Sequence, residues 1–429
     1  MQIDVKSLWS QLIPSRYALL ITIPILIFLQ RYITNQHMAY WRISVIILLL
    51  GIFFMARHRL IKPNWPLWVF CLAGCAVYTI NYHILGKLNL IPIQDYDNYR
   101  RIINKYVLYL PFLLLPTVFF YSGFKPKHFF NLLLLAAMGL IFYVNIHNFH
   151  LAFDREQLAD LFDPIISYDI GAMSIGVMLL CYAFYASGKW AYCLLLLACL
   201  SLFTIMLHGS RGTWIGLPLI VAVLCWQYFK TARNKCVLML VLFTAFITIN
   251  VTIPNSPIMN RMESLQADYR NISQYSYDNS SGIRLMLWQN SVHLFQSAPL
   301  TGVGIYGIQQ QNCALHAQGS LPICFQHQHN IVFEEMAANG MLGLLGLFFT
   351  FITPASYFLR QFRQHNNALT KNLSLMGLCI LTYYFCSGLT EYYLFFADVT
   401  YWFYFTLASL MSFVYLQNKA TQIRKVNDL

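Results

Sequence analysis

Charged residues are scarce in this chain of 429 residues: 10% are Asp, Glu, Lys or Arg, whereas 58% are hydrophobic. A soluble domain ordinarily carries about 25% charged residues, so this chain has too few to cover a water-exposed surface. The scarcity excludes a secreted enzyme, a cytosolic enzyme and a DNA-binding domain, although the net charge is +12. We therefore expect a polytopic membrane protein with membrane lipid around it and no nucleic-acid partner.

The chain also lacks an internal repeat, a low-complexity segment and a small-residue cleavage site after its first apolar run, so we expect no removable signal peptide. It has long apolar runs instead, and a membrane-spanning helix needs about 20 such residues. The candidate spans are 17–30, 43–55, 66–85, 106–122, 129–147, 166–187, 190–207, 213–229, 236–252, 329–353, 372–390 and 395–416.

Loop charges predict the orientation, because Lys and Arg concentrate in cytoplasmic loops. With a cytoplasmic N-terminus, 17 of the 28 Lys and Arg residues but only two of the 16 acidic residues fall on the cytoplasmic side. We therefore predict an all-α protein of about 12 transmembrane helices with both termini cytoplasmic. Its parts are helices 1–9 (residues 1–252), a large outer loop (253–328), helices 10–12 (329–416) and a cytoplasmic tail (417–429).

The outer loop is too polar to cross a membrane, and its segment 283–295 repeats apolar residues at helical spacing, which predicts an amphipathic helix. Of the 11 cysteines, only Cys313 and Cys324 lie in this loop. They are disulfide candidates if the loop faces an oxidising compartment such as the bacterial periplasm.

Arg211 lies in the segment His-Gly-Ser-Arg-Gly-Thr-Trp (208–214), between two apolar runs and at the outer end of a helix expected to begin near Thr213. A helix N-terminus attracts anions, and the flanking glycines let a ligand approach the backbone. A phosphate-bearing ligand fits this chemistry. The alternative is an ordinary arginine extending to the membrane interface.

Arg284 follows Ser280, Ser281 and Gly282 at the start of the amphipathic segment. A cation in the first turn of a helix is at the unfavourable end of the dipole, so it is better explained by an anionic partner. That partner is either a substrate or Asp278.

His327, His329 and Asn330 stand where the outer loop re-enters the membrane, ahead of Glu334 and Glu335. A histidine can accept a proton near neutral pH, which makes this segment a candidate for general-base chemistry. The His-x-His pair could instead bind a metal with Glu334 or His316, or serve structure alone. Because no standard zinc spacing follows, we expect no metal here.

The segment 302–307 fits the glycine pattern of dinucleotide-binding loops, but it lies in the outer loop of a membrane protein and lacks the βαβ context that this pattern requires. A Pro-Leu-Thr-Gly turn beginning at Pro299 is the better interpretation.

Taken in this order, the segments resemble the O-antigen ligase and polymerase superfamily of bacterial envelopes. The similarity rests on Gly-Ser-Arg-Gly-Thr-Trp (209–214), on Arg284 with Trp288 and 299–304, and on His329-Asn330 followed, after nine residues, by Gly340 and then Gly343. The motifs cover about residues 205–350, and residues 1–200 contribute topology only.

The resemblance implies a GT-C-like, metal-independent inverting glycosyltransferase of the bacterial inner membrane, with no cofactor and a periplasmic active site. Its donor would be a glycan on undecaprenyl pyrophosphate, and its acceptor a sugar hydroxyl of lipid A–core in lipopolysaccharide biosynthesis. His329, Arg211 and Arg284 would be catalytic: the arginines would hold the pyrophosphate and the histidine would accept the hydroxyl proton.

Ser210, His327, Asn330 and Trp288 would join the two arginines in binding substrate, and a basic loop (Lys87, Arg100, Arg101 and Lys105) could bind acceptor phosphates. Alternatives within the superfamily are an O-antigen polymerase and a protein O-oligosaccharyltransferase. Outside enzymes, the alternative is a secondary transporter, although the chain lacks the repeats common in that class.

Overall fold

The computed structural model describes residues 16–34, 41–87, 103–147, 157, 160, 164–273 and 279–427, and these residues form helices and turns without a β-strand. The main helices are α2 (Arg16–Thr34), α3 (Trp41–Arg57), α4 (Trp65–Lys87), α6 (Leu115–Ser122), α7 (Pro126–Ile141), α9 (Ile165–Tyr185), α10 (Gly188–Met206), α11 (Gly216–Tyr228), α12 (Arg233–Thr252), α13 (Pro257–Ser273), α14 (Ser280–Ser297), α15 (Gly304–Ala317), α16 (Ile331–Gln364), α17 (Ala368–Gly388) and α18 (Ala397–Asn427). Short helical turns add η2 (Leu110–Leu114), η3 (Phe142–His147), η5 (Arg211–Thr213) and η6 (Tyr393–Phe395).

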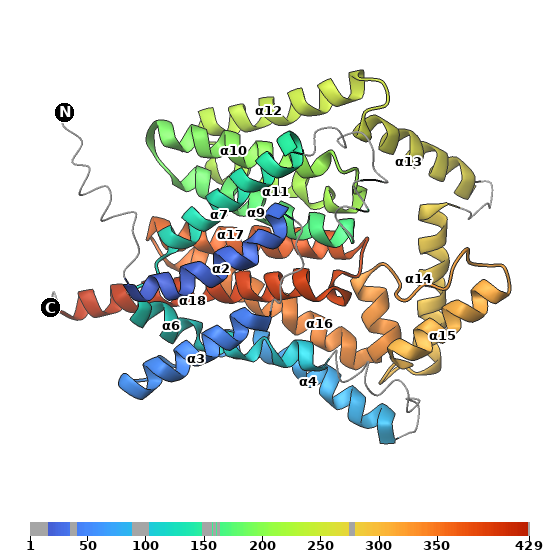
Figure 1. The fold of residues 1–429 in the computed structure, drawn as a ribbon, viewed down its shortest axis with the longest axis horizontal. Coiled ribbons are helices and arrows are strands. Elements are labelled where there is room, and N and C mark those ends of the chain that lie inside the picture. The colour runs from blue at the N-terminus through green and yellow to red at the C-terminus, as the bar shows by residue number, and fades with distance from the viewer. Residues whose placement is uncertain are drawn as a thin grey trace.

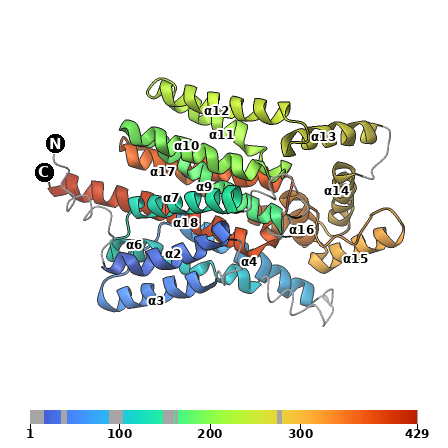
Figure 2. The same cartoon turned by 45° about the horizontal axis from the view of Figure 1, so that its top comes forward.

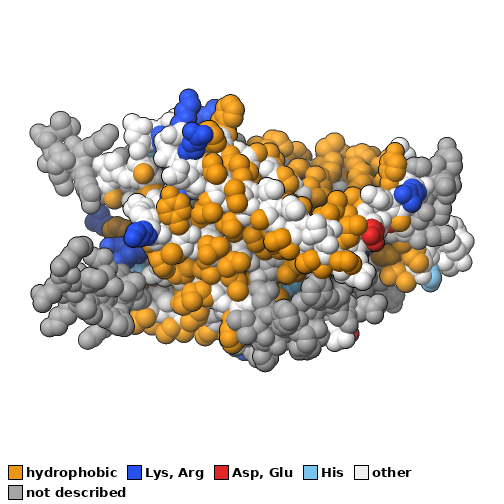
Figure 3. All heavy atoms as spheres, turned by 90° about the horizontal axis from the view of Figure 1, so that it is seen from above, with side chains coloured by type: hydrophobic (Ala, Val, Ile, Leu, Met, Phe, Trp, Pro, Cys, Tyr) orange, Lys and Arg blue, Asp and Glu red, His pale blue; other side chains and the backbone are white. Residues whose placement is uncertain are grey.

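The long helices form one elongated bundle, with α9, α17 and α18 in its interior and α3 and α12 on its outside (Figures 1 and 2). Helices α9 and α18 are the most buried, whereas most of α12 is exposed. The face in Figure 3 shows hydrophobic side chains over its middle and Lys and Arg gathered toward one end. This distribution is typical of a protein surrounded by lipid.

Among the described residues, eight helices are long and apolar enough to cross a membrane. Each of the twelve apolar runs coincides with helical structure, so the expected all-α polytopic membrane protein is confirmed. The number of membrane spans stays a prediction, because some of the helices that coincide with apolar runs are shorter or more polar than these eight.

The large loop contributes three helices, α13, α14 and α15, at the end of the bundle opposite the C-terminal end of α18 (Figure 1). Helix α14 covers the segment that periodicity predicts to be helical. Its N-cap is Asn279, whose side chain accepts hydrogen bonds from the backbone N–H groups of Ser281 and Gly282. The loop therefore presents the start of α14, with Arg284, to the membrane domain.

Helix α16 breaks at Gly340, where φ is 60°. The turn that begins at Pro299 docks into this break: the Met341 N–H donates to the Pro299 carbonyl at 2.8 Å, and the Val303 N–H donates to the Ala337 carbonyl at 2.9 Å. A Cβ on Gly340 would lie 2.6 Å from the backbone nitrogen of Gly302. The motif glycine is thus required by a positive φ and by the close approach of two backbones.

Replacing Gly340 by Ala should lower the free energy of unfolding by about 2–6 kcal/mol, since a side chain in this positive-φ conformation costs about 1–3 and overpacking about 1–3. Thermal unfolding in detergent measures the loss. Gly319→Ala is a matched control, because Gly319 also has a positive φ (76°) but nothing lies within 4 Å of an added Cβ. Equal effects of the two substitutions would contradict the role of backbone contact.

Cys313 and Cys324 form a disulfide, with their Cα atoms 4.4 Å apart. The bond joins α15 to the segment that leads back to α16. The nine other cysteines are free thiols in the structure. Mass spectrometry of unreduced protein should therefore find one linked pair, Cys313 with Cys324. Quantitative alkylation of both without reductant would exclude the bond.

Candidate active site

A pocket of about 740 Å³ lies where the loop helices meet the membrane helices, and both predicted arginines line it. The polar lining comes from the arginine segment, from α13 and from the start of α14, and the remaining walls are largely apolar. The lining includes Ser210, Arg211, Trp214, Arg261, Met262, Leu265, Ser281, Arg284, Leu285, Trp288 and Thr390. The pocket thus offers cations beside an apolar wall.

Arg211 lies in η5, before α11 rather than at the first turn of that helix, because α11 begins at Gly216 and not near Thr213. Its guanidinium donates a hydrogen bond to the Asp268 carboxylate at 3.2 Å. Ser281 at the start of α14 donates to the same Asp268 oxygen at 2.7 Å. Asp268 therefore ties the arginine segment to the loop helices.

Arg284 extends from the first turn of α14, and its Nη1 donates to the Ser280 hydroxyl at 3.0 Å. Burial lowers the pKa of Arg284, and Arg211 acts in the same direction, while Glu391 and Asp268 oppose it. The two guanidinium groups are thus close enough to interact electrostatically. Asp278, the alternative partner, lies outside the described residues.

Each arginine keeps a donor that the protein does not use. Among the described residues, Nη1 of Arg211 and Nε of Arg284 are buried and have no hydrogen-bond partner, and the same holds for the Ser210 hydroxyl. A buried donor without a partner costs about 1–3 kcal/mol, more when it is charged. These groups are therefore ready to bind an anionic ligand.

His329 forms a hydrogen-bonded pair with Glu391, a residue that the sequence analysis does not single out. Nδ1 of His329 lies 3.1 and 3.0 Å from the two carboxylate oxygens of Glu391. An ionised carboxylate only accepts hydrogen bonds, so Nδ1 carries the proton and Nε2 keeps a lone pair. The pair therefore holds His329 in the tautomer that a general base needs.

The charge of Glu391 follows from its surroundings. Burial alone would raise the pKa of Glu391, but the hydrogen bond from His329 and the electrostatic interactions with the two histidines and with Arg284 hold it below its usual value. Glu391 also accepts a hydrogen bond from the Tyr392 N–H at 3.0 Å. It is thus ionised at neutral pH and next to Thr390, which lines the pocket.

The backbone of His329 is unusual, because φ is 51° in a residue other than glycine. This left-handed conformation is uncommon and is held only when surrounding contacts require it. Here the neighbouring Asn330 fixes it: the Asn330 side chain caps α16 through the N–H groups of Val332 and Phe333 and donates to the Leu389 carbonyl at 2.8 Å. The side-chain amide of Asn330, which the sequence predicts to bind substrate, thus holds the start of α16 and the segment that carries His329 in place.

His327 is buried, and its Nδ1 lies 3.6 Å from Glu391. Burial lowers the pKa of His327 to about 4. A base that weak is neutral at pH 7 and accepts protons poorly. Of the two histidines, His329 is therefore the better candidate base, and His327 packs as a neutral ring against Phe395.

Trp288 links the pocket to the histidine segment. Its indole N–H donates to the Gln328 carbonyl at 3.1 Å, and its ring stacks on Phe333 with centroids 5.2 Å apart. Because it also lines the pocket, it fixes the wall between Arg284 and the segment that carries His329.

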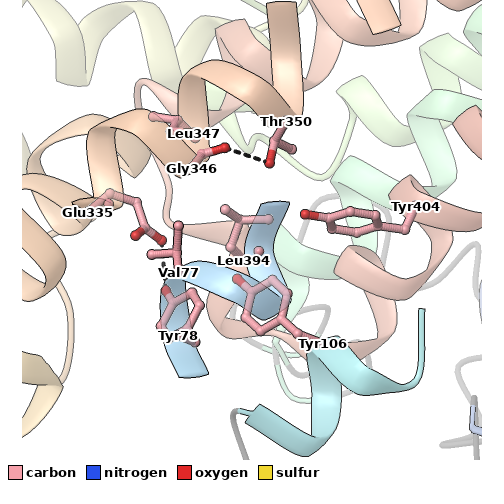
Figure 4. A pocket seen from close by; sticks show the side chains of 11 residues that line it. Val77, Tyr78, Tyr106, Glu335, Gly346, Leu347, Thr350, Leu394 and Tyr404 are labelled. Carbon is pink, nitrogen blue, oxygen red and sulfur yellow. Dashed lines mark hydrogen bonds between the residues drawn. The ribbon is translucent and has the colours of Figure 1, made fainter. Parts of the chain in front are cut away.

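Beneath this site, Glu335 lies inside the bundle and is fully hydrogen-bonded. The hydroxyls of Tyr78 and Tyr392 donate to Glu335 at 2.7 and 3.0 Å, and the Asn339 amide donates at 2.8 Å. Figure 4 shows Tyr78 pointing toward Glu335 beside a cavity of about 20 Å³. These bonds connect α4 and α16 to Tyr392, and so help to fix the position of Glu391, the residue before it, which pairs with His329.

Lys105, predicted to belong to a basic outer loop, is instead directed inward, where its ammonium group hydrogen-bonds the Leu394 carbonyl. Its ammonium group also lies 5.3 Å from the centroid of the Tyr106 ring. The side chain of Lys87, together with Arg100 and Arg101, lies outside the described residues.

His327, His329 and Glu391 also form a group that could hold a metal ion, since their ligand atoms lie within 4.8 Å of one another. The third member differs from the alternatives considered for the sequence, Glu334 and His316. Glu334 instead accepts a hydrogen bond from the Gln328 N–H at 2.7 Å, and His316 contacts the Leu321 carbonyl.

These features define a class: an all-helical membrane protein with an arginine-lined pocket next to a histidine–carboxylate pair. Residues 194–348 match the family model described as O-Antigen ligase. The chain is similar to an O-antigen ligase of Escherichia coli, with 25% identity over 215 residues, which cover 49% of this chain and 48% of the relative. These matches support an O-antigen ligase superfamily member over the part of the chain that they cover.

A second relative is an uncharacterized protein of Haemophilus influenzae, 27% identical over 184 residues, which cover 42% of this chain and 46% of that protein. The chain therefore spans about half the length of the curated relatives it matches. The family match includes both arginines and His329 but ends before Glu391.

Proposed function

We propose that the protein is an O-antigen ligase, which transfers a glycan from undecaprenyl pyrophosphate to a sugar hydroxyl of lipid A–core. The observation that carries the proposal is the placement of Arg211 and Arg284 in one pocket, beside the pair of His329 and Glu391. A lipid pyrophosphate donor needs cations for its anion, an apolar surface for its chain and a base for the attacking hydroxyl. The site supplies all three.

The reaction follows from these groups. Nε2 of His329 accepts the proton of the acceptor hydroxyl as its oxygen attacks the anomeric carbon. The bond from this carbon to the phosphate oxygen breaks, and the pyrophosphate leaves with the electron pair, its added charge stabilised by the guanidinium groups. A single displacement inverts the anomeric configuration. Since the sugar is already activated by its phosphate, the step uses no nucleotide.

The two arginines suit the leaving group because a guanidinium donates two parallel hydrogen bonds to phosphate oxygens. Asp268, which pairs with Arg211 at 3.2 Å, neutralises that cation when no glycan donor is bound in the pocket. Arg261 adds a third cation to the lining and widens the anion-binding surface. Apolar residues such as Leu265 and Leu285 provide the contact for the first isoprene units.

On this proposal the pocket opens at the periplasmic side of the inner membrane and both termini are cytoplasmic. The distribution of Lys and Arg supports the orientation, and the disulfide between Cys313 and Cys324 suits an oxidising compartment. We further propose that the arginines and not a metal stabilise the leaving group, so catalysis is metal-independent.

Lipid profiling of a deletion strain tests the ligase assignment. Loss of a ligase leaves bare lipid A–core and accumulates lipid-linked polymer, whereas loss of a polymerase leaves lipid A–core carrying a single repeat. Loss of a protein O-oligosaccharyltransferase removes glycan from protein and leaves lipopolysaccharide intact. Restoration of polymer on lipid A–core by the wild-type gene, and not by His329→Ala, is the expected result.

A further inference from the structure

A further pocket, of about 500 Å³, is lined by the turn between α3 and α4, by α6 and by the C-terminal part of α18. The C-terminal end of α18 lies at the end of the bundle opposite the loop helices (Figure 1). We refer to this pocket as the basic end pocket. It is lined by Arg59, Leu60, Ile61, Phe120, Tyr121, Leu416, Lys419 and Ala420. Nothing in the proposed transfer reaction uses this pocket.

Three segments build the basic end pocket, and hydrogen bonds hold two of them together. The Tyr121 hydroxyl of α6 donates to the Arg59 carbonyl at 2.9 Å. The Ile61 N–H donates to the Thr117 hydroxyl at 3.1 Å. The turn between α3 and α4 is thus fixed against α6, while α18 supplies Leu416 and Lys419 from the other side.

Within the part of the chain that the structure describes, no acidic side chain compensates the charge of this pocket. Arg59 and Lys419 are both exposed, and neither forms an ion pair with any described residue. Residues 41–87 and 103–147, which supply most of the lining, contain no Asp or Glu at all. In α18 the acidic residue Asp398 lies at the opposite end of the helix from Lys419.

The apolar part of the pocket is equally unusual for a charged surface. Phe120 is 57% exposed and Leu60 is 44% exposed, directly beside the two cations. A soluble anion would neutralise the charge but leave these side chains uncovered. A ligand with an anionic head and hydrocarbon chains would cover both.

We propose that the basic end pocket binds the headgroup of an anionic phospholipid. The phosphodiester lies between Arg59 and Lys419, and the acyl chains pass over Phe120 and Leu60. Because the pocket is at the other end of the bundle from His329, the bound lipid would belong to the leaflet opposite the proposed transfer site. The proposal does not depend on the proposed function.

Native mass spectrometry of the purified full chain, loaded with phosphatidylglycerol or with phosphatidylcholine, tests this site. Two surface cations near a membrane favour an anionic lipid by about tenfold or more, so wild-type protein should retain phosphatidylglycerol over phosphatidylcholine by that factor. The double variant Arg59→Gln/Lys419→Gln should lose most of this preference. A matched control is Lys230→Gln/Arg233→Gln, which removes two exposed cations outside the pocket and should keep it.

The charge-conserving variant Arg59→Lys/Lys419→Arg separates binding from misfolding, because it should retain the preference. An unchanged preference in the Gln double variant, or an equal loss in the control, would overturn the proposal. Inorganic phosphate and water-soluble glycerophosphoglycerol serve as competitors: displacement of the lipid by either at equal concentration would show that the pocket takes a free anion and would also overturn it.

Discussion

His329→Ala should reduce the rate of glycan transfer by about 10²–10⁴-fold while leaving donor binding nearly unchanged. General-base assistance contributes this much, which corresponds to about 3–5 kcal/mol of barrier at about 1.36 kcal/mol per decade. Nδ1 of His329 lies 3.0 Å from a Glu391 carboxylate oxygen, which leaves Nε2 of the neutral ring as the proton acceptor. The measurement is transfer from lipid-linked glycan to purified lipid A–core, with donor affinity determined on the same preparation.

His327→Ala is the matched control, because His327 lies two residues away and contacts the same carboxylate. Its pKa of about 4 makes it a poor base, so its loss should be milder. Glu391→Gln should lower kcat by about 10²-fold, the typical cost of a misplaced catalytic group, with little change in KM. A His327 variant more impaired than the His329 variant would show that the two roles are reversed.

Arg211→Ala and Arg284→Ala should each abolish most transfer and weaken donor binding, because each removes a charge-assisted contact to the leaving pyrophosphate. Loss of a single preorganised donor of this kind costs about 10²–10³-fold in kcat. Lys at either position should restore little, since an ammonium group does not reproduce the fork of the guanidinium. The assay is the same transfer reaction, with protein level in the membrane measured in parallel.

Asp268→Asn is an informative control for the arginines. It removes the anion that pairs with Arg211 at 3.2 Å but leaves both guanidinium groups in the pocket. If Asp268 only compensates charge in the absence of donor, its loss should spare transfer far more than either arginine substitution. Full activity in Arg211→Ala would mean that the pyrophosphate is held by other residues.

The fold class and the helix of the outer loop could be predicted because both rest on local periodicity. Apolar runs coincide with helices from α2 to α18, and the repeat in 283–295 coincides with α14. The break at Gly340 could not be predicted, since it depends on a turn from Pro299 that packs into α16 from outside the helix. Likewise, Arg211 precedes α11 because 211–213 forms its own turn.

Only some residues of the candidate site can be predicted from the sequence. Arg211 stands out because a cation between two apolar runs is costly. Arg284 stands out as a cation in the first turn of a helix, and His329 as a titratable group where the loop re-enters the membrane. The sequence does not link Glu391 to His329, because the two residues are 62 positions apart. The one available clue is that Glu391 is a charged residue at the end of an apolar run, where a carboxylate is costly. The contact of Asp268 with Arg211 and the place of Arg261 in the pocket depend on how α13 packs against the arginine segment, which the sequence does not show.

We expect this chain alone to carry the transfer chemistry, with arginines and a histidine–carboxylate pair in place of a metal. The most direct measurement is transfer by purified protein in detergent, given lipid-linked glycan and lipid A–core, with and without a strong chelator. We expect the joined product to form at the same rate in both samples. Loss of activity with chelator, restored by a divalent cation, would instead assign His327, His329 and Glu391 to a metal site and contradict the mechanism at its centre.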